Sequence, residues 1–139
     1  MMVFPEISPE HFKRRYYVGK IMFSLPRRRI LKNKRDFQIV YQNGRSFANR
    51  YLVLYVFPLK TLKNKKVGFA AGKKLGNAVV RNRVKRLLRE SYRLEQSKIN
   101  DDIWLLLVGR KSAVNAKQPV IGKAFLSLAG KAGIIKQEA

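Results

Sequence analysis

The side chains with the clearest chemistry in this sequence are the cations of one short segment, residues 81–93. Five of them recur at helical spacing: Arg81, Lys85, Arg86, Arg89 and Arg93. On a helix of 3.6 residues per turn they share one arc with Asn82, while apolar residues gather on another arc. A rigid rod with cations along one side is a surface for a polyanion, and nucleic acid is the usual one. The alternative interpretation is an ordinary solvated basic helix.

The charge of the whole chain favours nucleic acid as the partner. The 139 residues include 31 Lys and Arg against 8 Asp and Glu, a formal net charge of +23. Between Asp36 and Glu90 there are thirteen Lys and Arg and no acidic residue. Compact folding of so basic a segment costs self-repulsion, which a bound phosphate backbone would relieve. We expect no membrane partner, because no apolar run approaches the ~20 residues of a spanning helix.

Groups for catalysis by the protein itself are few. The single histidine, His11, has no partner at a useful spacing. Asp101 and Asp102 would face opposite sides of a strand, and we interpret them as solvated residues that precede one. The run from Gly72 to Gly76 lacks the P-loop spacing, which favours an exposed turn over a nucleotide pocket. Without cysteine there is no thiolate metal site. We therefore expect neither catalytic residues nor metal ligands, so that the catalytic groups of any enzyme containing this chain come from elsewhere.

The domain organisation is simple. Residues 1–26 carry scattered prolines and no sustained period, and we expect a poorly ordered extension, with Met22 as a candidate native start. Residues 27–135 are predicted to form a single RNA-binding domain, followed by a tail over 136–139. The N-terminus has no continuous apolar stretch of signal-peptide type, so the default expectation is a cytoplasmic location.

Six elements are expected to position the basic and aromatic side chains. The first helix follows Asn33, a capping residue, and stops at Asn43-Gly44, a pair typical of a left-handed helix end. The basic helix opens after a turn and cap at Gly76-Asn77. The other elements are strands over 46–57, 67–73 and 103–108 and a closing helix from Pro119 to about Lys131. The order is α-β-β-α-β-α, with allowance for one or two split strands.

The aromatic residues could serve a single-stranded nucleic acid. Such a strand is held by cations along its backbone and by aromatic rings under its bases. The candidates are Phe37, Tyr41 and Tyr55 for stacking and Lys73, Lys74 and Arg81 for the cations. The aromatic face of the first strand is either covered by a helix or used for stacking, and core packing is an equal alternative for each ring. The small residues Gly68, Ala70 and Gly72 leave one face of the second strand nearly bare, which permits a close approach.

Several segments, taken in order, resemble the protein subunit of bacterial ribonuclease P over about Met22 to Ile135. They are Phe37-Gln38-x-Val40-Tyr41 with Gly44, Ala48-Asn49-Arg50, Val67-Gly68, the run from Lys73 to Val79 and Arg81-Asn82-Arg83-Val84-Lys85-Arg86. The resemblance implies an α/β (α+β) two-layer sandwich of the ribosomal-protein-like type with a left-handed βαβ crossover. That handedness is rare, and no sequence pattern here indicates it.

The resemblance also implies a function, which is to bind a catalytic RNA and help it remove the 5′ leader of precursor tRNA. Hydrolysis would use Mg²⁺ held mainly by the RNA, and the protein alone would be an inactive part of this endonuclease. No obligate protein partner is evident. The positions implied to face the RNA subunit are Arg81, Asn82, Arg83, Lys85, Arg86 and Arg89. The positions implied to bind the leader, in a cleft between the first helix and the sheet, are Phe37, Tyr41, Tyr55, Lys73 and Lys74.

Two other classes of basic protein fit part of the pattern. A ribosomal structural protein would need the charged helix but not an aromatic cleft lined by small residues. A DNA-compacting protein would usually dimerise and show a longer helical or arm-like distribution of charge. Restored cleavage of precursor tRNA by a ribonuclease P RNA at low magnesium would separate the three classes.

Overall fold

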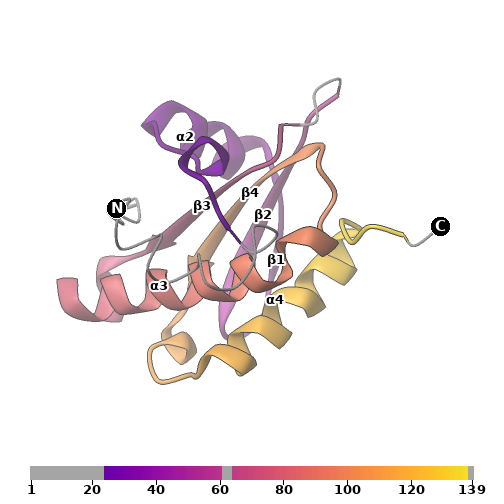
Figure 1. The fold of residues 1–139 in the computed structure, drawn as a ribbon. Coiled ribbons are helices and arrows are strands. Elements are labelled where there is room, and N and C mark those ends of the chain that lie inside the picture. The colour runs from indigo at the N-terminus through magenta and orange to yellow at the C-terminus, as the bar shows by residue number, and fades with distance from the viewer. Residues whose placement is uncertain (1–23, 61–63, 138–139) are drawn as a thin grey trace.

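The computed structural model describes residues 24–60 and 64–137 (Figure 1). The N-terminal extension up to residue 23, with Met22 and His11, therefore lies outside the described residues. The helices are α2 (Lys34–Asn43), α3 (Ala78–Glu95) and α4 (Gln118–Ala132), and the strands are β1 (Arg45–Ala48), β2 (Leu52–Pro58), β3 (Lys66–Ala71) and β4 (Ile103–Gly109). Short 3-10 turns are η2 (Arg27–Arg29), η3 (Lys73–Leu75), η4 (Gln96–Lys98) and η5 (Lys111–Ala113).

The four strands form one sheet in the order β1-β2-β4-β3. The β1–β2 and β2–β4 pairs are antiparallel. Strands β3 and β4 are parallel neighbours joined through α3, which is the βαβ unit that the resemblance implies. Helices α3 and α4 cover one face of the sheet and α2 lies on the opposite face (Figure 1). The mixed α+β class is confirmed.

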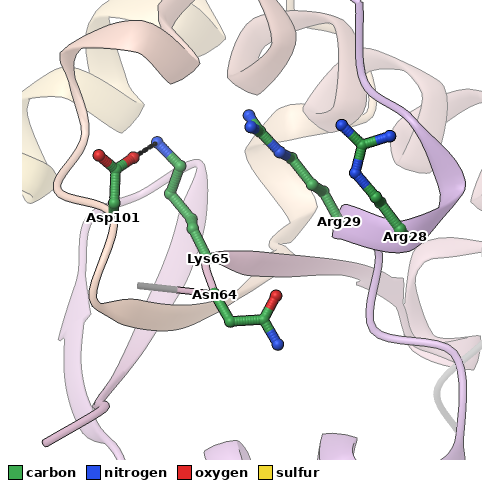
Figure 2. A pocket seen from close by; sticks show the side chains of 5 residues that line it. All are labelled: Arg28, Arg29, Asn64, Lys65 and Asp101. Atoms are coloured by element: carbon green, nitrogen blue, oxygen red, sulfur yellow. Dashed lines mark ion pairs between the residues drawn. The ribbon is translucent and has the colours of Figure 1, made fainter. Parts of the chain in front are cut away.

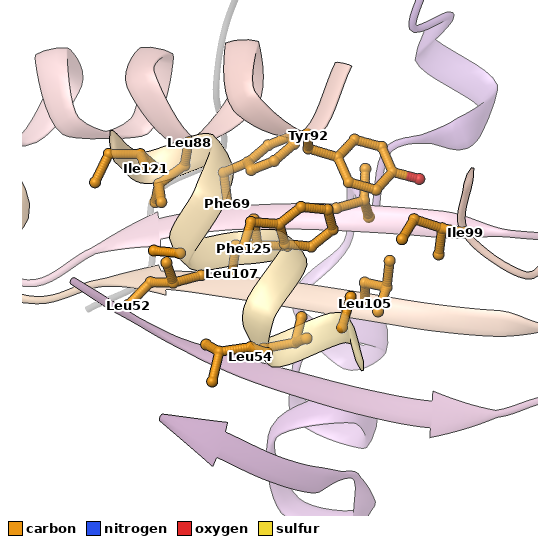
Figure 3. Packing of buried hydrophobic residues seen from close by; sticks show 14 of the residues in the cluster. Leu52, Leu54, Phe69, Leu88, Tyr92, Ile99, Leu105, Leu107, Ile121 and Phe125 are labelled. Carbon is orange, nitrogen blue, oxygen red and sulfur yellow. The ribbon is translucent and has the colours of Figure 1, made fainter. Parts of the chain in front are cut away.

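The main hydrophobic core lies between the sheet and the α3–α4 pair (Figure 3). Alternate residues of β2, among them Leu52 and Leu54, point into it and are fully buried, as the period of two predicts. Its centre is a set of three aromatic rings, with the centroid of Tyr92 6.0 Å from that of Phe69 and 5.7 Å from that of Phe125. Both contacts are edge-to-face, the arrangement that the ring quadrupoles favour.

The predicted strand over 46–57 is a hairpin of two strands. Asn49 divides them, because its side-chain Oδ1 accepts from the backbone N–H groups of Tyr51 and Leu52 at 3.0 and 3.1 Å. An asparagine that binds the backbone two and three residues ahead closes a turn, so the chain reverses and β1 pairs back on β2. The observed order is α-β-β-β-α-β-α, within the allowance made for split strands.

Both ends of the first helix lie where they were predicted, but the conformation expected at its C-terminal end is wrong. Asn33 caps α2, with its Oδ1 accepting from the N–H of Asp36 at 2.9 Å. Gly44, however, is extended (φ −78°, ψ 156°) and not left-handed. The need for glycine there is a close approach, since a β-carbon would lie 2.5 Å from the carbonyl oxygen of Val40 and 2.9 Å from that of Val56.

Candidate nucleic-acid interface

A turn that requires glycine starts the basic helix α3. Gly76 has φ +144°, a region that residues with a side chain rarely adopt, and Asn77 then caps the helix by accepting from the N–H of Val80 at 3.0 Å. The predicted turn and cap are therefore confirmed. Just before the turn, η3 exposes Lys73 and Lys74 beside the first turn of the helix. Two exposed lysines and the cations of α3 thus lie within one short stretch of chain.

The predicted cationic arc of α3 divides into two stripes. Asn82, Arg83 and Arg86 are exposed, and Arg81 is partly buried. Lys85 and Arg89, one helical turn apart, retain only 3% and 2% of their exposure. The accessible cations are therefore concentrated in the first half of α3, and the sequence period alone could not separate them from the buried stripe.

Arg83 and Arg93 each form side-chain contacts within the protein. The Nη1 of Arg83 donates to the carbonyl oxygen of Val114 at 2.8 Å, which ties α3 to the segment after η5. Arg93 forms a two-point contact with Glu90, with both nitrogen–oxygen distances 2.9 Å. Arg83 remains exposed at the surface, so its guanidinium can serve both the fold and a ligand, whereas Arg93 is mostly buried.

Of the predicted leader-binding aromatics, two form an accessible pair. Tyr41 of α2 is 50% exposed, and its ring centroid lies 5.1 Å from that of Tyr55 on β2. Burial, followed by the neighbouring Tyr41, raises the pKa of Tyr55 above its usual value, so the phenol of Tyr55 stays neutral near pH 7. A partly exposed ring pair is suited to stacking on a base.

Phe37 is not part of that exposed pair. It is 2% exposed and belongs to a small core between α2 and the sheet, with Leu31, Val40, Ala70 and Leu106. Its ring occupies the space above Gly68, where a β-carbon would lie 2.7 Å from the ring. The bare face of β3 is thus filled by a phenylalanine, and Phe37 supports the position of α2.

The remaining predicted leader-binding residues lie across the sheet from the tyrosine pair. Lys73 and Lys74 follow the end of β3, and β4 lies between β3 and the strand that carries Tyr55. The pairing register places Tyr55 level with Gly68, so Lys73 lies two strands away from Tyr55 and five residues further along the chain than Gly68. The floor between contains Val53 and Val108, both partly exposed and paired in register. The alternation of β2 placed Val53 on the face of Tyr55, but no sequence pattern marked either valine as part of a binding site.

A separate polar pocket lies at the other end of β3. Its cavity of about 310 Å³ is lined by Arg28, Arg29, Asn64, Lys65 and Asp101 (Figure 2). Lys65 is only 6% exposed, and its ammonium lies 3.3 Å from the Asp101 carboxylate and donates to two backbone carbonyls at 2.8 Å each. Burial lowers the pKa of Lys65, and the Asp101 charge partly opposes that change.

The side chain of Asp101 is 45% exposed, and it also forms two ion pairs that the sequence did not indicate. Burial would raise its pKa, but the hydrogen bond from Lys136 and the charge of Lys65 outweigh it and hold the pKa below the usual value. The Lys136 ammonium lies 3.1 Å from its carboxylate. Asp102 is exposed, as predicted. Both oxygens of Asp101 are thus engaged by lysines, which leaves the carboxylate with a role in the fold.

Within residues 24–60 and 64–137, no cluster of three or more His, Asp or Glu side chains could hold a metal ion. No helix in the same ranges combines the length and the apolar character needed to cross a bilayer.

Comparison with known proteins gives one consistent family. A family model described as Ribonuclease P matches residues 25–133. A ribonuclease P protein component of Alkaliphilus metalliredigens is 41% identical over 105 residues, which cover 76% of this chain and 94% of that protein. The corresponding protein of Lachnoclostridium phytofermentans is 43% identical over 99 residues, covering 71% and 84%.

Solved structures show the same fold. The RNase P protein of Staphylococcus aureus superposes with a TM-score of 0.68 at 30% identity, covering 78% of this chain and 98% of that one. The RNase P protein of Thermotoga maritima has a TM-score of 0.65 at 24% identity, over 73% and 94% of the two chains. The second likeness concerns the fold alone.

Proposed function

Because the chain belongs to the bacterial ribonuclease P protein family, we propose that it binds the catalytic RNA through α3 and the 5′ leader of precursor tRNA beside α2. The resemblance noted in the sequence is confirmed by the family match over residues 25–133. Family membership makes the chain the accessory subunit of a ribonucleoprotein endonuclease that acts in tRNA 5′ processing, with an RNA as its partner.

The observation that carries the RNA-binding proposal is the exposed cationic start of α3. Arg81, Asn82, Arg83 and Arg86 are accessible there, next to Lys73 and Lys74. Cations in this density neutralise phosphates and release counterions, which supplies much of the affinity for RNA. Lys85 and Arg89 are buried along the same helix. We assign them a secondary part, in which they raise the positive potential behind the contact surface.

The leader site is proposed to use Tyr41 and Tyr55 as the stacking pair. Val53 and Val108 would form an apolar floor, and Lys73 and Lys74 would meet the phosphates on the far side. Phe37 would contribute indirectly: by packing between α2 and the sheet, it would hold α2 at the distance from the sheet that the RNA leader requires. Recognition by stacking and backbone charge is tolerant of base identity, which suits leaders of many sequences.

Hydrolysis is proposed to use Mg²⁺ held mainly by the RNA subunit. The part of the protein would be to hold the substrate and to screen the repulsion between two RNAs, so that less magnesium is needed for the same affinity. A cytoplasmic location, together with the RNA subunit and precursor tRNA, belongs to the same proposal.

Reconstitution tests this function directly. A ribonuclease P RNA should cleave precursor tRNA at low magnesium when this chain is added, and the chain alone should not cleave it. Addition of a ribosomal protein of similar charge is the control for non-specific screening. Cleavage that is equally restored by that protein, or Mg²⁺-dependent cleavage by nuclease-free chain alone, would contradict the proposal.

A further inference from the structure

A second pair of aromatic side chains lies on the α2 face of the sheet. Helix α2 packs over the middle of this face, where Phe37 contacts Gly68 and Tyr41 contacts Tyr55. Two residues further along the strands, in the direction away from Val53 and Val108, the register pairs Phe57 with Trp104 and Trp104 with Lys66. This row, here called the tryptophan platform, is therefore on the other side of α2 from the Val53–Val108 floor of the proposed leader site, with Tyr55 between the two.

In the tryptophan platform, three side chains are held in place by contacts with one another and with the backbone. The ring centroids of Phe57 and Trp104 are 6.3 Å apart, at an interplanar angle of 44°. The indole Nε1 donates to the backbone carbonyl of Asn64 at 3.1 Å, which fixes the orientation of the ring. The Lys66 ammonium lies 5.8 Å from the centroid of that ring. An oriented indole with a cation at its face has the two elements that grip a nucleotide, a stacking surface and a phosphate partner.

Core packing does not account for the whole platform. The buried residues between α2 and the sheet already form a closed group, and Phe57 and Trp104 pack at its margin while staying partly exposed. Lys66 is partly exposed as well. A lysine over an exposed ring is a weak contact, and its long side chain can move to a phosphate while a base takes the place over the indole. Stacking of a base is the stronger of the two interactions.

We propose that Phe57, Trp104 and Lys66 form a second site for unpaired RNA, in which a base stacks on the indole and Lys66 contacts the adjoining phosphate. The site rests on the RNA binding proposed above but uses none of the residues of the leader site, and α2 lies between it and the Val53–Val108 floor. The surplus of positive charge over the chain, +23, favours a polyanionic occupant over a protein one. With one cation in the platform, stacking supplies most of the affinity, so binding there depends only weakly on salt.

The protein carries a natural probe of this site, since Trp104 is its only tryptophan. The full chain is titrated with a labelled, unstructured oligoribonucleotide of about six bases, and the anisotropy of the label and the emission of Trp104 are recorded together. An abasic strand of the same length and charge is the control for the phosphate backbone. We expect the emission to be quenched in step with binding of the oligoribonucleotide, and little changed by the abasic strand.

A pair of variants separates the platform from general charge. Lys66→Gln should lower the affinity obtained from the quenching titration several-fold. Lys123→Gln removes the same charge from the exposed side of α4 and should leave that affinity unchanged. Two results would contradict the proposed platform site: Trp104 emission that does not change while anisotropy shows binding, or equal quenching by the abasic strand. Neither result would contradict the proposed function. Absence of any anisotropy change would instead count against RNA binding by the chain as a whole.

Discussion

The ring of Phe37 lies directly on Gly68, so closely that a β-carbon on the glycine would be 2.7 Å from the ring's Cζ atom. The contact joins α2 to β3, and it fills the hollow that a strand leaves where it has no side chain. Ala70, one step along the same face, is 2% exposed in the same small core. The small residues of β3 thus serve to let α2 come close to the sheet.

We predict that Gly68→Ala destabilises the protein. The added methyl must displace an aromatic ring that is itself buried, and overpacking of this kind costs about 1–3 kcal/mol. Urea unfolding followed by circular dichroism measures the change in the free energy of unfolding. Gly72→Ala is the matched control, because nothing lies within 4 Å of its β-carbon and its φ of −78° suits alanine. Equal stability of the two variants would show that the ring is not held tightly against β3.

Local capping explains why helix starts were predictable. Asn33 and Asn77 each bind a backbone N–H three residues ahead, so the interaction needs no information from elsewhere in the chain. The alternation of β2 was predictable for the same reason. The position of the end of α2 was predictable too, but the extended conformation of Gly44 was not, because the glycine is needed there for its close approach to the carbonyls of Val40 and Val56, and Val56 lies on a different element.

Long-range packing also explains why the sequence could not predict which of the site residues are exposed. Periodicity placed Phe37 and Tyr41 on one face of a helix, but only the position of Gly68 beneath the helix decides that the first ring is buried and the second exposed. The same holds for α3, where Arg86 is exposed and Lys85, its neighbour, is buried. The residue types in the sequence indicated RNA binding, but packing between distant segments determines which aromatic and basic side chains are accessible to an RNA.

Arg86 and Arg83 are predicted to differ when each is replaced by alanine. Arg86→Ala should lower RNA affinity and reduce the slope of log K against log salt by about 0.7–0.9, with no change in stability. Arg83→Ala should do the same and also lower the free energy of unfolding by about 0.5–1.5 kcal/mol, because the carbonyl of Val114 loses its donor. Filter binding over a range of salt and urea unfolding provide the two measurements.

Arg86→Lys is the charge control for this pair and should keep the salt slope of the parent protein. An unchanged slope in both alanine variants would show that the start of α3 does not contact the RNA backbone. A loss of stability in Arg86→Ala would mean that its guanidinium, too, is part of the fold.

The core phenol of Tyr92 predicts how stability changes at alkaline pH. Burial raises its pKa above the usual value near 10, so the unfolded chain releases this proton at a lower pH than the folded chain. Above about pH 10 the folded state binds more protons, and stability must fall as pH rises, by at most about 1.4 kcal/mol per pH unit. Tyr92→Phe lacks this group. Its free energy of unfolding relative to the parent should be constant from pH 7 to 9 and improve above pH 10. Parallel curves over the whole range would contradict the assignment.

The two aromatic residues of α2 are predicted to differ in what their replacement by alanine changes, stability for Phe37 and leader binding for Tyr41. Phe37→Ala removes a buried ring and should cost about 3–5 kcal/mol of stability. Tyr41→Ala removes a half-exposed ring and should leave stability nearly unchanged, yet weaken binding of leader-bearing precursor tRNA by about 1–3 kcal/mol, the contribution of one stacked base.

Binding of mature tRNA, which has no leader, provides the internal control for Tyr41→Ala, and Tyr41→Phe should restore leader binding because stacking needs the ring and not the hydroxyl. Affinities are measured with the reconstituted complex and the stability by urea unfolding of the protein alone. If Tyr41→Ala weakens leader-bearing and mature tRNA equally while remaining folded, the exposed face of the tyrosine pair does not stack on the leader. The leader site would then have to be sought elsewhere on the protein.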